Sequence, residues 1–383
     1  MRSTPRVAFD AWGHRIMGNI AGLEVGLPRS IDEVDTAWIT AVLRTSGAID
    51  ATTVVAHMDT EAFAVGAGLL SLLYRATLTY DGGAGPQSVI VKFPIDLPSQ
   101  RGIADALGFY PREIRFYREL APHSPVRTPV VHAAMMADDS TDFVVVMEDL
   151  SDRTTPDQRI GATWEQTLAS IDAMAALHAK WHEHPDLAEY TTTFPPMLNP
   201  GYLHGLPPIF KAGWPNAQVH GADYLTPELV MFGDRYGDHL EFMLTTANSP
   251  ATFVHGDWRL DNLFFDGDDV TVIDFQISGM ASGVYDLAYF VSQSIAPEVR
   301  AGREQELIDR YVDQLATNGV VRDRDEVAHQ FKVAVAQCFI YGVSSFPSYD
   351  DLPERSQDLV KLLLGRSARA IIDFDALSAF PEL

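Results

Sequence analysis

The sequence predicts an α+β chain, with an antiparallel sheet in its N-terminal part and a mainly helical C-terminal part. Segments rich in β-branched and aromatic residues are grouped before residue 150, and turn residues at 81–85 separate two of them, as in an antiparallel meander. Beyond residue 150, long stretches carry apolar residues at three- and four-residue spacings, which is typical of amphipathic helices. We therefore expect an N-terminal lobe over residues 1–148, with a leading helical segment, and a C-terminal lobe over residues 149–383.

The N-terminal lobe is expected to combine two helices with a sheet. Residues 31–48 place Val34, Trp38 and Val42 on one apolar face, which predicts a helix. A second helix is expected over residues 111–120. Strands are expected at 52–58, 69–80, 88–93 and 143–147.

The C-terminal lobe is expected to be built from long helices. These are predicted at 164–182, 227–246, 304–316, 326–341 and 359–374. Short strand-like segments at 253–254, 263–265 and 270–273 interrupt them, with turn residues between the last two. Residues 185–226 are rich in Pro, Gly and aromatic residues and show little periodicity, so we expect a loop-rich insertion there.

Composition narrows the range of partners. The chain has 383 residues, of which 46% are hydrophobic, and it can bury a large core. With 28 basic and 52 acidic residues its formal charge is −24, and no run of Lys and Arg could follow a phosphate backbone, so neither nucleic acid nor a membrane is an expected partner. The single cysteine, Cys338, excludes an intramolecular disulfide, and no apolar run approaches the roughly 18 residues of a membrane helix. We expect a soluble, cytoplasmic protein.

One motif carries the chemistry. Residues 255–262 read His-Gly-Asp-Trp-Arg-Leu-Asp-Asn, and Asp274 follows twelve residues after Asn262. Phosphoryl transfer requires a base that orients the attacking hydroxyl, oxygen ligands for magnesium, and a cation that offsets transition-state charge. Asp257 is the candidate base and Arg259 the candidate cation. Asn262 and Asp274 offer the hard oxygen atoms that Mg²⁺ prefers.

The spacing of His255, Asp257 and Asn262, with an Asp-Phe-Gln run at 274–276, resembles the aminoglycoside phosphotransferase and choline kinase superfamily, whose members are relatives of protein kinases. This resemblance implies a two-lobed protein-kinase-like fold, with ATP and Mg²⁺ as cofactors and a small-molecule alcohol as substrate. The residues of the motif, together with the aromatic segment 109–117, are more similar to those of ecdysteroid-kinase-like and acyl-CoA-dehydrogenase-linked members than to those of antibiotic-resistance enzymes.

The resemblance extends upstream and implies a nucleotide site. Gly66 and Gly68 resemble a nucleotide-covering loop between the first two strands. Lys92 ends a Val-Ile-Val-Lys run that resembles the lysine motif of the third strand, where the lysine contacts phosphates. Glu148 belongs to a segment that resembles the hinge between lobes, where backbone groups meet the adenine. Asp286 matches a family aspartate that braces the catalytic loop.

Lys92 needs a carboxylate partner, and the helix at 111–120 offers Glu113 and Glu119. At about 100° per residue, Glu113 lies inside the apolar arc of this helix, while Glu119 falls well outside it. The apolar arc consists of Ile114, Phe116, Tyr117, Leu120 and Ala121. We therefore expect Glu113 to pair with Lys92.

Other interpretations remain open at this stage. Trp258 beside the base either stacks on a ligand or packs in the core. His178 and His182 lie four apart, a spacing that can bind zinc. The main alternative function is a catalytically silent, kinase-like nucleotide-binding regulatory module, which would be expected to lack the base or a metal ligand. Residues 185–250 and 326–370 are where acceptor specificity is expected, and they do not identify the acceptor.

Overall fold

The computed structural model describes residues 26–63 and 70–380. The chain divides into two compact units. The N-terminal unit consists of Met1–Ser124 and Thr128–Asp152, and the C-terminal unit consists of Pro125–Arg127 and Arg153–Leu383. None of the described helices is long and apolar enough to span a bilayer.

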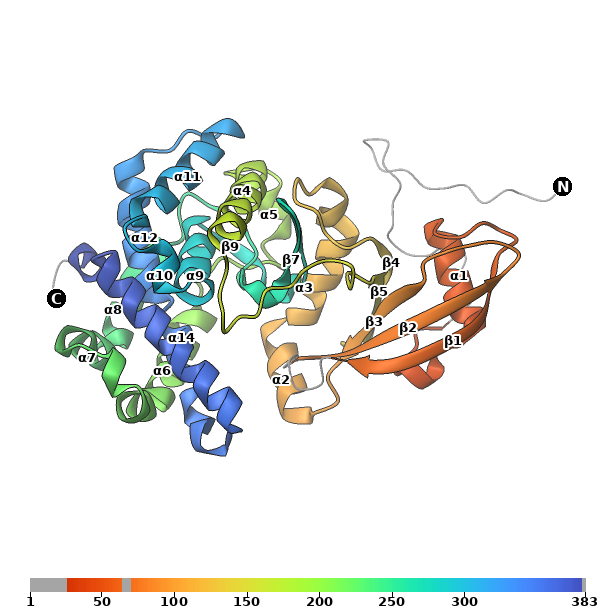
Figure 1. Cartoon of the computed structure of the whole chain (residues 1–383), viewed down its shortest axis with the longest axis horizontal. Coiled ribbons are helices and arrows are strands. Elements are labelled where there is room, and N and C mark those ends of the chain that lie inside the picture. The colour runs from red at the N-terminus through yellow and green to blue at the C-terminus, as the bar shows by residue number, and fades with distance from the viewer. Residues whose placement is uncertain (1–25, 64–69, 381–383) are drawn as a thin grey trace. The chain divides into compact units, whose positions relative to one another are not determined.

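A five-stranded antiparallel sheet forms the centre of the N-terminal unit (Figure 1), with the strand order β1-β2-β3-β5-β4. Its strands are β1 Val54–Phe63, β2 Ser71–Asp81, β3 Ser88–Pro94, β4 Val131–Met136 and β5 Phe143–Glu148. The sequence did not predict β4. Its Ala and Met residues have little strand preference, and pairing with β5 determines its conformation instead.

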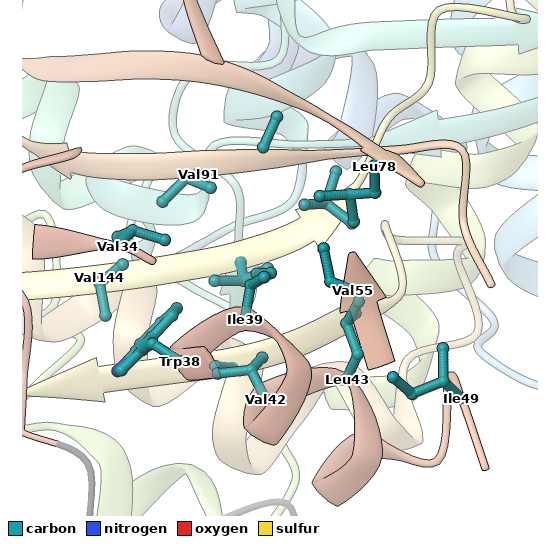
Figure 2. Close-up of a cluster of buried hydrophobic side chains, with 14 of the residues drawn as sticks. Val34, Trp38, Ile39, Val42, Leu43, Ile49, Val55, Leu78, Val91 and Val144 are labelled. Carbon is teal, nitrogen blue, oxygen red and sulfur yellow. The ribbon is translucent and has the colours of Figure 1, made fainter. Parts of the chain in front are cut away.

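Helix α1, Thr36–Ser46, packs its apolar face against this sheet. The Asp35 side chain caps its first turn by accepting a hydrogen bond from the Trp38 backbone at 2.7 Å, and Gly47 ends it in the left-handed conformation. Figure 2 shows Ile39 and Leu43 among valine and leucine side chains of the strands. Burial of each large side chain contributes about 1.5–3 kcal/mol, so this layer stabilises the whole unit.

Two further helices follow β3 in the sequence: α2, Pro98–Leu107, and α3, Phe109–Arg115. Gly108, at φ 67°, separates them. The helix expected over 111–120 is present, but its second half, Phe116–Leu120, is a π-helical turn.

Helices dominate the C-terminal unit, and the predicted fold class is confirmed (Figure 1). They are α4 Trp164–Trp181, α5 Leu187–Tyr190, α6 Pro200–His220, α7 Pro227–Asp234, α8 Tyr236–Thr246, α9 Val284–Ser294, α10 Pro297–Arg300, α11 Glu304–Thr317, α12 Arg324–Gln337, α13 Phe339–Val343 and α14 Glu354–Asp373. The single helix expected over 227–246 is two helices, which meet at Arg235.

The expectation of a loop-rich insertion at 185–226 was wrong, because helix α6 occupies half of it. The Asn199 side chain caps this helix at the Tyr202 backbone, and Pro200 occupies a first-turn position that needs no donor. Phe210 and Trp214, one turn apart, are buried against other helices. Three interior prolines, Pro207, Pro208 and Pro215, hid this periodicity, since proline usually ends a helix.

Two small pairs of antiparallel strands flank the candidate site residues in the sequence. Strand β6, Thr252–Val254, pairs with β9, Gly279–Ala281. Strands β7, Leu263–Asp266, and β8, Asp269–Val272, form a hairpin in which Leu263 lies opposite Val272. This register brings the residue before β7 and the residues after β8 to the same end of the hairpin.

Candidate active site

The β7–β8 hairpin places the two proposed metal ligands. Asn262 directly precedes β7, and its carbonyl accepts a hydrogen bond of 3.0 Å from the backbone of Ile273. Asp274 comes one residue later, with φ 67° and ψ 60°. Asn262 and Asp274, which are twelve residues apart in the sequence, thus lie at the same end of the hairpin.

The Asp257 carboxylate is held through both oxygens. Asn262 Nδ2 donates to Oδ2 at 3.0 Å, and Arg259 Nε lies 3.3 Å from the same oxygen. Tyr289 donates its hydroxyl to Oδ1 at 2.6 Å. Only 13% of the Asp257 side chain is exposed, so these contacts decide its orientation. The structure therefore brings Asp257, Arg259 and Asn262 together, as the motif predicted.

The contacts also determine the charge on Asp257. Burial raises the pKa of its carboxyl, but the Arg259 guanidinium and the hydrogen bonds from Tyr289 and Asn262 outweigh that effect. The net pKa lies below the usual value for aspartate. Asp257 is consequently ionised at neutral pH and can accept a hydrogen bond from a hydroxyl.

Helix α9 braces the loop that carries Asp257. Asp286 is fully buried and accepts hydrogen bonds from the backbone of His255 at 2.7 Å and of Gly256 at 2.9 Å. The His255 ring adds a second tie, because Nδ1 accepts from the Asp257 backbone and Nε2 donates to the Ile273 carbonyl. His255 thus has a structural part in this loop, and Asp286 makes the bracing contacts expected of it.

The oxygen atoms near Asn262 and Asp274 suit a hard cation. Both amide hydrogens of Asn262 are used on Asp257, one on the carboxylate and one on the carbonyl at 2.9 Å, which leaves Asn262 Oδ1 as its possible ligand atom. Gln276 Nε2 donates to Asp274 Oδ2 at 3.1 Å, and Gln276 Oε1 is buried without a hydrogen-bond partner among the described residues. Carboxylate and amide oxygens are the ligands that Mg²⁺ prefers, so this set fits magnesium.

In the N-terminal unit, Lys92 on β3 and Glu113 on α3 form a buried ion pair of 2.7 Å. Glu119 instead pairs with Arg115 at the surface, at 3.0 Å. The pairing that helical phase predicted is thus confirmed. Glu148 ends β5 and receives a hydrogen bond of 3.0 Å from the Val130 backbone on its side chain. Gly66 and Gly68 lie outside the described residues.

Trp258 and His178 both have structural roles. Trp258 is fully buried and donates to Ser170 Oγ at 2.8 Å, so it packs in the core. Both ring nitrogens of His178 are engaged, one by Tyr311 at 2.8 Å and one by Asp286 at 3.1 Å, which leaves neither for zinc. Sequence reasoning missed Tyr289. The only available signal was its position three residues after Asp286, one turn along the same helix.

The antiparallel sheet and the helical unit give this chain the fold of solved aminoglycoside phosphotransferase and choline kinase structures. The model of the ecdysteroid kinase-like family matches residues 65–320, which is more than half of the chain. The chain belongs to the ecdysteroid kinase-like family.

Solved structures share the fold at low sequence identity. Choline kinase from Cryptosporidium parvum is 13% identical with a TM-score of 0.53, covering 90% of this chain and 96% of its own. A candidate aminoglycoside phosphotransferase from Ralstonia eutropha JMP134 is 16% identical with a TM-score of 0.50, covering 90% of this chain and 98% of its own. The search of curated proteins found no match.

Proposed function

We propose that this protein is an ATP- and magnesium-dependent phosphotransferase that moves the γ-phosphate to a hydroxyl of a small molecule. The observation that carries the proposal is the Asp257 carboxylate, ionised and held through both oxygens beside Asn262 and Arg259. This arrangement provides a fixed acceptor for a hydroxyl proton next to amide and carboxylate oxygens suited to a metal. The family supports the same class of reaction.

In the proposed reaction, Asp257 accepts a hydrogen bond from the acceptor hydroxyl and aims its oxygen at the γ-phosphorus. The new oxygen–phosphorus bond forms as the bond from the γ-phosphorus to the leaving oxygen of ADP breaks, and the hydroxyl proton passes to Asp257. A carboxylate with a lowered pKa is a weak base, so Asp257 contributes mainly by positioning the hydroxyl. Arg259 offsets negative charge that develops at the phosphoryl group.

The site residues of each unit are assigned separate roles toward the nucleotide. Lys92, oriented by Glu113, is proposed to contact the phosphates, and the backbone around Glu148 to meet the adenine. Asn262 and Asp274 would hold Mg²⁺, which neutralises phosphate charge when bound. Gly66 and Gly68 are proposed to cover the nucleotide.

The test is a screen of ADP release with Mg²⁺ and ATP across alcohols, amino sugars and hydroxy acids, followed by Asp257→Asn. We expect this substitution to lower kcat about 10²–10⁴-fold, the usual contribution of a positioned base. Asp261→Asn is the matched control, because Asp261 also pairs with Arg259, at 3.3 Å, whereas the hydrogen bonds to the Asp257 carboxylate come from Asn262 and Tyr289. Full activity of Asp257→Asn on an identified acceptor would falsify the proposal. Thermal stabilisation by ATP without turnover on any acceptor would point instead to a silent nucleotide-binding module.

A further inference from the structure

Tyr289 contacts the candidate base Asp257 but lies outside the motif at residues 255–262. Tyr289 lies on α9, is 7% exposed, and donates its hydroxyl to Asp257 Oδ1 at 2.6 Å. We propose that Tyr289 is a positioning residue that fixes the plane of the Asp257 carboxylate toward the acceptor hydroxyl. The inference rests on the proposed function of Asp257 as the base.

The division of contacts between the two carboxylate oxygens supports this role. Asn262 donates a hydrogen bond to Oδ2, Arg259 forms an ion pair with the same oxygen at 3.3 Å, and Tyr289 donates a hydrogen bond to Oδ1. The torsion that turns a carboxylate has a broad energy profile, so contacts to one oxygen leave the plane free to rotate. A hydrogen bond to the other oxygen prevents that rotation. Oδ1 keeps a lone pair for the acceptor hydroxyl, in a direction that Tyr289 determines.

Tyr289 is itself held rigidly. Its ring meets the Tyr341 ring edge to face, with the centroids 4.7 Å apart, and stacks on Tyr285 at 6.4 Å. These ring contacts need no hydroxyl: the Tyr285 and Tyr341 hydroxyls are hydrogen-bonded to each other, and the ring that packs on Tyr289 is kept when the Tyr285 hydroxyl is removed. Burial and the charge of Asp257 raise the pKa of Tyr289 well above its usual value, so its hydroxyl remains a donor.

Helix α9 therefore fixes both the backbone of the catalytic loop and the side chain of Asp257. Asp286 binds the backbone of the catalytic loop, and Tyr289, one turn further along α9, binds the side chain of Asp257. Both anchors move together because the helix is rigid and all its residues are buried. Loss of the Tyr289 hydroxyl should leave the loop in place and release only the carboxylate plane.

The experiment compares Tyr289→Phe with Tyr285→Phe in the full chain. Each variant removes one buried hydroxyl from the same ring cluster, but only Tyr289→Phe removes a contact to Asp257. With the acceptor found by the ADP-release screen, we expect Tyr289→Phe to lower kcat about tenfold or more and to leave KM for ATP unchanged. Tyr285→Phe should leave both constants unchanged. Equal kcat values in Tyr289→Phe and the unsubstituted protein overturn the inference, as does an equal loss in both variants.

A spectroscopic measurement tests the contact without any acceptor. Protein labelled with [¹³Cγ]aspartate gives a carboxyl resonance for Asp257 that Asp257→Asn identifies by its absence. At neutral pH this resonance should move in Tyr289→Phe and stay in Tyr285→Phe; an unmoved resonance in Tyr289→Phe overturns the inference. Activity of Asp257→Asn is measured in parallel. If Asp257→Asn is inactive while Tyr289→Phe is unaffected, this inference fails alone, whereas an active Asp257→Asn defeats the proposed function.

Discussion

The catalytic loop depends on a backbone conformation that only glycine adopts without strain. Gly256 has φ 84°, and a Cβ atom added to it would lie 2.7 Å from the Ile277 carbonyl oxygen. Gly267, in the turn of the β7–β8 hairpin, has φ 59° but open space around it. The two glycines thus share the conformational requirement and differ in the steric one.

Alanine substitution at these two positions separates conformational cost from steric cost. We expect Gly267→Ala to lower the free energy of unfolding by about 1 kcal/mol, the usual cost of the left-handed conformation. Gly256→Ala should cost at least about 1 kcal/mol more, since Ile277 belongs to backbone that also carries Asp274. Urea denaturation of both variants measures the difference. Equal losses would show that the contact with Ile277 is relieved at little cost.

Asp286 concentrates three contacts in one buried carboxylate, two from the backbone of the catalytic loop and one from the His178 ring of α4. In Asp286→Asn one of the two backbone N–H groups would face an amide NH₂, which cannot accept a hydrogen bond. A buried donor left without an acceptor costs about 1–3 kcal/mol, and we expect this loss in urea denaturation. Asp266→Asn, at an exposed position of the nearby hairpin, is the control and should be neutral. If Asp286→Asn is as stable as the control, Asp286 does not brace the loop.

At this scale, sequence reasoning succeeded where chemistry fixes both residue type and spacing. The contacts among Asp257, Arg259 and Asn262 lie within one short motif, so the sequence could predict them. Tyr289 could not be predicted in the same way. Its hydroxyl reaches Asp257 from a different helix, and only the packing of α9 against the catalytic loop brings the two residues together.

Among the elements, helix α3 shows how helical phase decides a contact. It turns Glu113 inward to Lys92 and leaves Glu119 outside, where Glu119 pairs with Arg115. Helical periodicity did not predict α6, because its three interior prolines, Pro207, Pro208 and Pro215, argue against a helix. Buried packing of its apolar face outweighs the local preference there, which a single sequence does not reveal.

The phase of α3 leads to a matched pair of variants. Glu113→Gln removes the negative charge that pairs with the buried Lys92 ammonium at 2.7 Å, and breaking such a pair costs about 3–5 kcal/mol. Glu119→Gln removes an exposed pair worth about 0.5 kcal/mol. If Lys92 binds phosphates, Glu113→Gln should also lower the thermal stabilisation that Mg-ATP gives, while Glu119→Gln keeps it. Equal stabilisation by Mg-ATP in both variants would contradict a nucleotide role for the ion pair.

The chain carries a formal charge of −24, and folding lowers the pKa of several of its carboxyl groups. Hydrogen bonds from Thr52 and Thr53 lower the pKa of Asp50 to about 2, and the Arg159 side chain does the same for Asp157. Arg101 lowers the pKa of Asp142. These groups occur in both units, so their effect on stability is a property of the whole chain.

The sign of the pH dependence follows from these shifts. A carboxylate whose folded pKa lies below the unfolded value stabilises the protein fully above the unfolded value, near 3.8 for aspartate. As pH falls from about 3.8 to about 2, the unfolded chain binds more protons and the stabilisation is lost. We therefore expect Tm to fall steeply across this window in calorimetry at constant ionic strength. The double variant Asp50→Asn and Asp157→Asn should show a shallower fall of Tm. The control double variant Asp266→Asn and Asp268→Asn removes the same charge at exposed positions and should keep the steep fall. An identical slope in the two double variants would refute the assignment.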